Sequence, residues 1–281
     1  MFVSAACAET SGAETNSTEA SSAKMSHGHN PTGHSTMNDI PVSEFNREQA
    51  LDRSQSAIGN VLGNYTLRDS HGNVVNLGSY KGKPLVISLI YTSCYHICPT
   101  TTQHLLKVVK SARDALGNES FNVVTIGFDV LVDTPPMMSH FARQQGVELE
   151  NWRFLSSDKA TIDLLVEDLG FIYFPSPNGF DHLIQTSLID QSGKVFGQIY
   201  GMEFDMPLLV DPLKRLVFSG EGGGVVKKIS DRILLFCTVY DPAGNKYRFN
   251  YSIFIGTFIG FLCVLFVGTQ LYREWRLKLR S

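Results

Sequence analysis

The chain has 281 residues, 43% of them hydrophobic, and its 24 basic and 27 acidic side chains give a formal net charge of -3. This near-neutral balance argues against nucleic-acid binding, which usually shows as a basic face or stripe. Five cysteines are too few for a fold built from disulfides, and the length suits one ordinary domain with extensions.

Residues 1–55 are predicted to be a signal remnant followed by a disordered linker. Phe2–Glu9 has the small residues of a secretory cleavage site, and Cys7 offers a weaker lipoprotein alternative. From Glu9 to Thr36 small and polar residues predominate, so this segment buries too little apolar surface to offset its ordering entropy. A short tract could gather copper, although a low-complexity linker explains it as well. Its members are Met25, His27, His29, His34 and Met37.

Residues 56–220 are predicted to form one globular α/β domain. A hairpin is expected over residues 65–77, with its turn at Ser70–Asn73. The continuous apolar run 84–91 predicts a strand that is covered on both faces. A helix should follow from Pro99 to Leu116, where Gly117 ends it.

The rest of this domain alternates between strands and helices and ends in a hairpin and a helix. This order predicts a thioredoxin-like fold. The expected elements are a strand at 123–128, a helix from Asp133-Thr134-Pro135 to about 145, a strand at 152–155, a helix at 161–169, strands at 186–189 and 195–199 around a turn at 190–193, and a helix at 207–218.

The C-terminal part carries a membrane signal. Residues 221–250 are expected to be a linker and juxtamembrane segment, and residues 251–272 a transmembrane helix. Tyr251 to Leu271 contains no charge for 21 residues, enough to cross a hydrocarbon core of about 30 Å. The tail 273–281 is rich in Arg and Lys, so the positive-inside rule predicts a cytoplasmic C-terminus and a periplasmic domain at the inner membrane.

Two cysteines between the predicted strand and helix concentrate the chemistry. Cys94 and Cys98 lie four residues apart, where backbone N–H groups and the helix dipole stabilise a thiolate. If the loop winds into the helix, both sulfurs share one face, close enough for a disulfide or one metal ion. A purely structural disulfide is the weaker interpretation, because closing so short a loop removes little unfolded-state entropy.

The residues around this pair resemble the Sco/SenC copper chaperones of the thioredoxin superfamily. The family pattern Tyr-Thr-x-Cys-Pro-Asp-x-Cys-Pro is matched by residues 91, 92, 94, 98 and 99. Its Asp-Pro-x-x-Asp-Thr-Pro is matched by Asp129 and by Asp133-Thr134-Pro135, and its later Asp-His by Asp181-His182. The resemblance covers about residues 60–218.

The resemblance implies one copper ion, Cu(I) or Cu(II), bound by Cys94, Cys98 and His182. The implied function is to help build the dinuclear copper centre of a respiratory oxidase, with the copper-bearing subunit as partner and other periplasmic copper carriers as further candidates. Two thiolates and an imidazole suit copper, whereas structural zinc normally takes a fourth protein ligand. Without metal, the two cysteines can form a redox-active disulfide.

Asp129, Asp181 and His96 are candidates for supporting roles around the metal. Asp181 could fix the tautomer of the imidazole or simply be solvated. Asp129 ends a strand near the site, and Asp133 is most simply a helix cap. His96, with Tyr95, replaces the family's Pro-Asp between the cysteines; it favours the thiolates and could compete as a ligand. Val130 and Leu183 also depart from the pattern, as does the C-terminal position of the anchor.

Two alternatives to copper delivery stay open. A thiol–disulfide oxidoreductase that reduces the oxidase cysteines would need Cys94 and Cys98 but not His182. A copper or redox sensor is neither supported nor excluded. The remaining sulfur side chains have no assigned role: Met202 and Met206 fit core packing or a turn contact, Cys263 fits packing in the span, and Cys237 is expected to be a free thiol.

Overall fold

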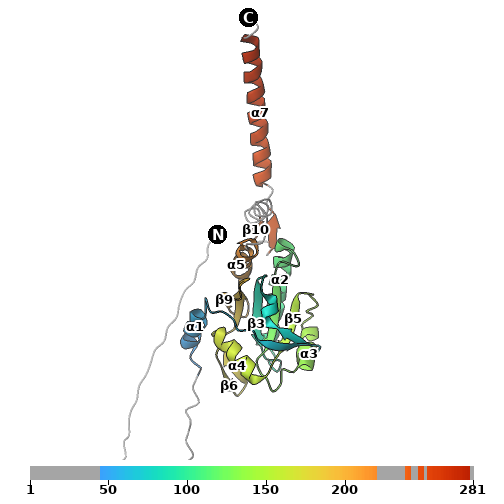
Figure 1. Ribbon diagram of the computed structural model, residues 1–281, viewed down its shortest axis with the longest axis vertical. Coiled ribbons are helices and arrows are strands. Elements are labelled where there is room, and N and C mark those ends of the chain that lie inside the picture. The colour runs from blue at the N-terminus through green and yellow to red at the C-terminus, as the bar shows by residue number, and fades with distance from the viewer. Residues whose placement is uncertain (1–44, 220–237, 242–245, 250–251, 279–281) are drawn as a thin grey trace, which may run out of the picture. The chain divides into compact units, whose positions relative to one another are not determined.

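The computed structural model describes residues 45–219, 238–241, 246–249 and 252–278 (Figure 1). The helices are α1 (Arg47–Ser56), α2 (Ile97–Leu116), α3 (Pro135–Gln144), α4 (Lys159–Asp168), α5 (Met206–Ser219) and α7 (Ser252–Lys278), with a short 3-10 helix η1 (Leu77–Tyr80). The strands are β1 (Thr66–Asp69), β2 (Val74–Asn76), β3 (Leu85–Ile90), β4 (Asn122–Gly127), β5 (Trp152–Ser156), β6 (Tyr173–Ser176), β7 (Gly179–His182), β8 (Gln185–Ile189), β9 (Val195–Tyr200), β10 (Thr238–Asp241) and β11 (Lys246–Phe249).

Seven strands form one mixed sheet in the order β2-β1-β5-β4-β3-β8-β9. Strands β3, β4 and β5 run parallel, because α2 and α3 return the chain across the sheet between them. Strand β8 pairs antiparallel with β3 and with β9. The mixed sheet with its connecting helices is the predicted thioredoxin-like α/β arrangement.

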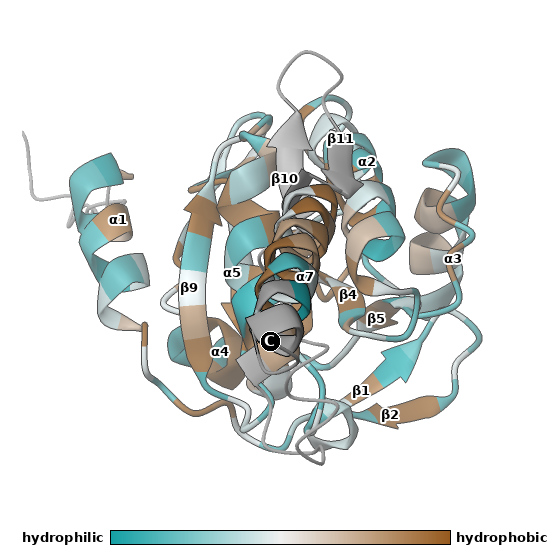
Figure 2. Cartoon of the chain, turned by 90° about the horizontal axis from the view of Figure 1, so that it is seen from above, coloured by the Kyte–Doolittle hydropathy of each residue, from teal (hydrophilic) through white to brown (hydrophobic). Residues whose placement is uncertain are grey.

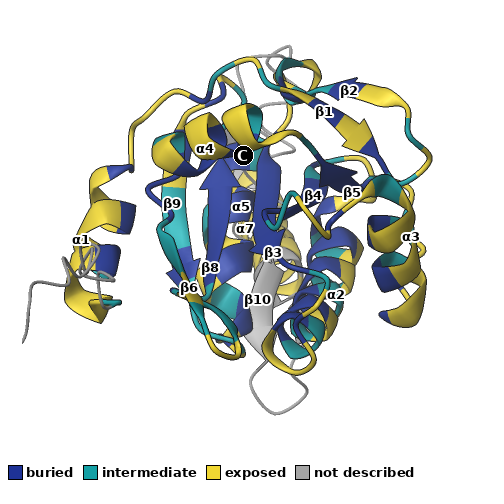
Figure 3. Cartoon of the chain, turned by 90° about the horizontal axis from the view of Figure 1, so that it is seen from below, coloured by how far each residue is buried: buried dark blue, intermediate teal, exposed yellow. Residues whose placement is uncertain are grey.

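The core lies around the central strands. All six residues of β3 are buried, as the continuous apolar run predicted, and β4 is buried from Val123 onward. Figure 3 shows the central strands in dark blue, while exposed residues colour the outer surfaces of α1, α3 and α4. Burial of these side chains is the main stabilising contribution, about 1.5–3 kcal/mol for each large apolar side chain.

Helix α2 begins two residues earlier than the sequence predicted. Its buried positions include Leu105, Val108 and Ala112, spaced three and four residues apart as on one helix face. Pro99 lies in the first turn, where its missing N–H removes no intrahelical bond. Gly117 follows the last helical residue with φ of +97°, which confirms the predicted end.

Two predicted turns are present, each built around an aspartate and a glycine. Asp69 Oδ1 accepts bonds from the backbone N–H groups of His71 and Asn73, and Gly72 has φ of +86°. Asp190 Oδ1 accepts in the same way from Ser192 and Lys194. The acidic side chain replaces the missing backbone partners in both turns.

Helix α1 corrects the predicted linker, since residues 47–55 are helical instead of disordered. The helix is bound to the sheet through Ser54, which is fully buried. Its hydroxyl donates to Gln185 Oε1 at 2.6 Å and lies 2.9 Å from Tyr200 Oη. Ala50 is the other buried residue of the helix, so its buried face carries no large apolar side chain whose periodicity could have revealed it. The rest of the predicted linker, residues 1–44, lies outside the described residues.

A second element that the sequence did not predict is the β6–β7 hairpin. Tyr173 pairs with His182 and Ser176 with Gly179 in an antiparallel register. Pro175 lies on this two-stranded ribbon, outside the main sheet, where it interrupts no central ladder. The hairpin holds His182 in a fixed position along a strand.

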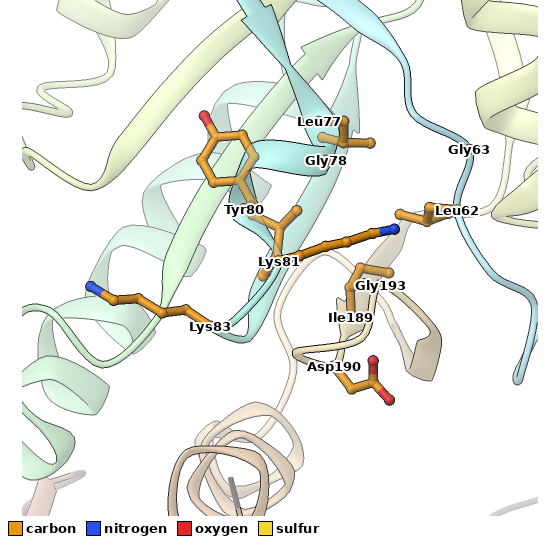
Figure 4. A pocket seen from close by; sticks show the side chains of 11 residues that line it. Leu62, Gly63, Leu77, Gly78, Tyr80, Lys81, Lys83, Ile189, Asp190 and Gly193 are labelled. Carbon is orange, nitrogen blue, oxygen red and sulfur yellow. The ribbon is translucent and has the colours of Figure 1, made fainter. Parts of the chain in front are cut away.

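A small cavity of about 20 Å³ lies near the amino end of β3, away from the cysteines (Figure 4). The Lys81 side chain extends across it and approaches Gly193 closely, since a Cβ at Gly193 would lie 2.9 Å from Lys81 Cε. The cavity has room for about one water molecule. The cavity indicates imperfect packing at the amino end of β3.

Helix α7 contains a stretch, Ile255–Arg273, that is long and apolar enough to cross a membrane. Its described side chains are exposed, and Figure 2 shows hydrophobic residues along much of the helix. The helix confirms one apolar C-terminal element. The assignment of α7 as a candidate membrane span rests on its length and composition.

Candidate metal centre

The two cysteines lie between the carboxyl end of β3 and the first turn of α2. Cys94 N–H donates to the Tyr91 carbonyl at 3.2 Å, and Cys98 N–H donates to Cys94 Sγ at 3.3 Å. The N-cap residue of α2, His96, makes no side-chain cap bond. The sulfur of Cys94 therefore takes the place that a capping oxygen usually has at a helix N-terminus.

The two thiols have opposite acid–base properties. A hydrogen bond from the Cys98 thiol, with backbone N–H groups of Cys98 and His96, lowers the pKa of Cys94 to about 5. The same bond and burial raise the pKa of Cys98. Both are free thiols and both are buried. Cys94 is therefore the thiolate at neutral pH, and Cys98 retains its proton.

Tyr91 connects the dithiol to the β6–β7 hairpin. Its hydroxyl is hydrogen-bonded to Cys94 and to the backbone of Phe180, and burial raises the pKa of Tyr91 to about 12. A Cβ at Gly179 would lie 2.7 Å from the Tyr91 hydroxyl oxygen, so only glycine leaves room for this ring. Tyr91 belongs to the family pattern found in the sequence, but that pattern does not indicate its role between the dithiol and the hairpin.

His182 reaches the site through strand order. Because β8 runs antiparallel to β3, with Thr186 opposite Ser88, the residues before β8 lie beside those after β3. The imidazole packs against the rings of Tyr91 and Phe128, with centroid distances of 6.1 and 5.4 Å. Tyr91 and His182, which are far apart in the sequence, are thus brought into one aromatic cluster.

The hydrogen bonding of His182 leaves one ring nitrogen available. Nδ1 lies 2.7 Å from the Leu183 carbonyl oxygen, which can only accept, so Nδ1 carries the proton. Burial lowers the pKa of His182, which favours the neutral ring. Nε2 then retains a lone pair, the form in which imidazole binds metals. The carbonyl of Leu183 has the orienting role that was considered for Asp181, whose side chain is exposed.

Asp133 joins the dithiol loop to the loop after β4. Thr92 donates to Asp133 Oδ1 through its backbone N–H and its hydroxyl, both at 2.7 Å, and the Asp129 N–H donates to Oδ2 at 2.9 Å. A Cβ at Gly127 would lie 2.4 Å from Asp133 Cβ, so glycine is required there. The expected helix cap is wrong: Thr134 is the N-cap of α3, and Asp133 connects two loops.

The structure brings together some of the predicted site residues. Cys94 and Cys98 are in contact, and His182 packs against the ring of Tyr91, whose hydroxyl is hydrogen-bonded to Cys94. Among the described residues, no three His, Cys, Asp or Glu side chains already form a metal-binding group. The His96 side chain is exposed, and Asp129 contributes its backbone N–H to Asp133.

The other sulfur candidates lie apart from this arrangement. Met206 is buried at the start of α5, Met202 is partly buried, and Cys263 is exposed on α7. His104, which sequence analysis did not single out, lies with Nε2 2.8 Å from the Phe204 carbonyl oxygen and connects α2 to the segment before α5. Cys237 and the His/Met tract at 25–37 lie outside the described residues.

Comparison with known proteins places the chain in a family. A model of the SCO1/SenC family matches residues 53–217. The chain belongs to the SCO1/SenC family. This match spans the seven-stranded sheet and includes Cys94, Cys98, Asp133 and His182. It confirms the predicted resemblance.

Three relatives illustrate the similarity. The SCO1 protein homolog of Bacillus subtilis is 27% identical over 146 residues, 50% of this chain and 73% of that protein. The structure of BsSco, a member of the Sco family of cytochrome c oxidase assembly proteins with a disulfide switch, is 23% identical, with a TM-score of 0.52 over 57% of this chain and 94% of that chain. The structure of Bradyrhizobium japonicum ScoI with copper bound is 26% identical, with a TM-score of 0.46 over 57% of this chain and 99% of that chain. The Sco fold is the predicted thioredoxin-like fold.

Alkylation should distinguish the two thiols. In the reduced full-length chain, the rate of Cys94 modification by iodoacetamide should rise with a midpoint near pH 5, because the thiolate is the nucleophile. Cys98→Ser should move this midpoint upward. Mass spectrometry of digests gives the rates, and the chain unfolded in urea is the control. A midpoint above pH 8 in the folded chain contradicts the assignment.

Asp133→Ala should loosen the two loops and destabilise the fold by about 2–3 kcal/mol, because the donors from Thr92 and Asp129 lose their acceptor. Burial raises the pKa of Asp133 to about 6. The part of its stabilisation that comes from the bound proton is therefore complete below the unfolded pKa of about 4 and is lost as pH rises through about 6.

The loss caused by Asp133→Ala should accordingly be larger at pH 5 than at pH 8. Urea unfolding of the full chain in detergent measures it, and Asp114→Ala, at an exposed position on α2, is the matched control. A loss that grows with pH contradicts the linkage.

Proposed function

We propose that this protein is a membrane-anchored copper chaperone that binds one copper ion through Cys94, Cys98 and His182. Its partner would be the copper-bearing subunit of a respiratory oxidase, whose dinuclear centre it would help to assemble. Other periplasmic copper carriers would supply the metal. Membership of the SCO1/SenC family supports this function, and the side chains around Tyr91 support the site.

The observation that carries the proposal is the protonation pattern of the three ligands. Cys94 is stabilised as a thiolate, and His182 is held neutral with Nε2 available. Soft sulfur and imidazole donors favour copper, and a three-ligand set suits it better than structural zinc, which normally takes four protein ligands. Because metal ligands must be deprotonated, copper binding would release the proton of Cys98.

The residues around the site would orient the ligands. The Leu183 carbonyl fixes the imidazole tautomer, and the backbone N–H of Cys98 supports the Cys94 sulfur. Aromatic rings exclude water on the imidazole side, where Phe128 and Phe171 lie 5.4 and 5.3 Å from the ring centroid. Copper would be the cargo, and its affinity for the partner's ligands would favour its transfer. The chain would hold it and present it.

A second function, thiol–disulfide exchange with the oxidase cysteines, is favoured by the unequal thiols. A stabilised thiolate beside a protonated second thiol is the arrangement of an attacking and a resolving cysteine. Cys94 would attack a partner disulfide, and Cys98 would then displace the partner and leave an intramolecular disulfide. Copper binding and this exchange would exclude each other, because both use the same sulfurs.

Anaerobic Cu(I) titration of the full chain tests the metal site. We expect one copper per chain, with an affinity lowered at least about tenfold by His182→Ala and more by Cys98→Ser, since each removes a ligand. His140→Ala, an exposed histidine on α3, is the matched control. Equal binding by all variants would remove the proposed site, and dependence on the cysteines alone would leave the exchange function.

Reporter fusions test the proposed topology. A fluorescent protein fused after Ser281 should fold and fluoresce, and a fused alkaline phosphatase should be inactive, because the basic tail places that end in the cytoplasm. Cell fluorescence and phosphatase assays give the result. A dark fluorescent fusion with an active phosphatase would reverse the proposed orientation.

A further inference from the structure

Four large apolar side chains are exposed on the two loops that Asp133 joins. Tyr95 and Leu131 have exposed fractions of 96% and 88%, and Ile97 and Val132 of 40% and 36%. Tyr95 and Ile97 lie between Cys94 and Cys98 in the chain, and Leu131 and Val132 directly precede Asp133. We call these four residues the apolar rim.

The apolar rim is held in place before any partner arrives. Its two loops are tied by the bonds from Thr92 and Asp129 to the Asp133 carboxylate. The Val132 N–H also donates to the Asp129 carbonyl at 2.9 Å, which closes a turn in the second loop. Little conformational entropy therefore remains to be lost when another molecule docks there.

The dithiol loop of the rim carries a recessed sulfur. Cys94 is only 8% exposed, whereas its neighbour Tyr95 is almost fully exposed. A macromolecule that reaches Cys94 therefore meets the Tyr95 side chain, while a small reagent can enter beside it. Single exposed apolar residues are ordinary, but several around one reactive group indicate an interaction site.

The charges near the rim indicate what kind of surface it fits. In the two loops, residues 91–98 and 129–134, the acidic side chains are Asp129 and the buried Asp133, and Lys and Arg do not occur. An acidic partner segment would find no lysine or arginine in these loops. An apolar one would bury the Tyr95 ring, and tyrosine is enriched where binding energy concentrates.

We propose that the apolar rim is the docking surface for the partner of Cys94, and that this partner presents its sulfur on a segment flanked by apolar, uncharged side chains. This rests on the proposed function, in which Cys94 exchanges copper or a disulfide with another protein. It adds the chemical character of the recognised segment, and it assigns recognition to side chains that bind no metal.

The test uses disulfide exchange, so that it does not depend on copper. Two short peptides carry one cysteine joined by a disulfide to thionitrobenzoate; leucine and valine flank it in one, serine and glutamate in the other. The Cys94 thiolate attacks the peptide sulfur, the peptide–thionitrobenzoate bond breaks, and the yellow thionitrobenzoate anion leaves with the electron pair. Its absorbance gives the rate for the reduced full chain in detergent.

We expect the apolar peptide to react about tenfold faster than the polar one, a difference of about 1.4 kcal/mol in docking. The variant Tyr95→Ser/Leu131→Ser should lose this preference, and Tyr95→Ser alone should reduce it. All variants should react equally with the small reagent dithiobis-nitrobenzoate, which shows that Cys94 is unchanged. Leu164→Ser/Leu208→Ser, exposed on α4 and α5, is the matched control and should keep the preference.

Several results would overturn the proposal. Equal rates for the two peptides, or a preference that survives loss of Tyr95 and Leu131, would show that the rim does not select apolar segments. Sedimentation showing a dimer that the rim substitutions dissociate would identify a second copy as the occupant. Faster exchange after deletion of residues 1–44 would identify that segment instead. Failure of copper titration alone would refute metal delivery and leave these results valid.

Discussion

The buried carboxylate of Asp133 is the constraint on which the site depends. It accepts bonds from Thr92 and Asp129, so the loop after β3 and the loop after β4 move as one body. Gly127 makes the approach sterically feasible. Burying this group opposes its ionisation, and the donors favour the ionised form, so the connection balances a desolvation cost against hydrogen bonds. The positions of the dithiol and of the apolar rim both follow from it.

The hydrogen bonds at the N-terminus of α2 then give the two thiols different pKa values, so one is ionised and the other keeps its proton. Cys94 stands in for a capping oxygen, and Cys98, inside the first turn, donates to it and keeps its proton in a buried place. The same inequality would serve both proposed activities, metal binding and disulfide exchange, because both begin with a thiolate. The two proposed activities differ in whether His182 takes part, so this residue would decide between delivering a metal and exchanging electrons.

The aromatic cluster connects His182, the proposed third ligand, to the Cys94 thiolate. Tyr91 contacts Cys94 through its hydroxyl and His182 through its ring, and the absence of a side chain at Gly179 lets the β6–β7 hairpin close on it. Movement of this hairpin would therefore change both the hydrogen bond to sulfur and the distance of the imidazole. In the proposed metal site, metal capture and the support of the thiolate would therefore be coupled through Tyr91.

The sequence by itself determined the family, the buried strands and the reactive pair, because strand burial and a thiol beside a helix start depend on local pattern. It did not reveal α1, whose contact with the sheet is polar, or the hairpin that holds His182. Only the tertiary structure decided that Asp133 connects loops, that a carbonyl orients the imidazole, and that Tyr95 and Leu131 share a rim. The contacts of Asp133 with Thr92 and of His182 with the Tyr91 ring join residues far apart in the chain. Even for the neighbouring Leu183 carbonyl, no local pattern records which donor meets which acceptor.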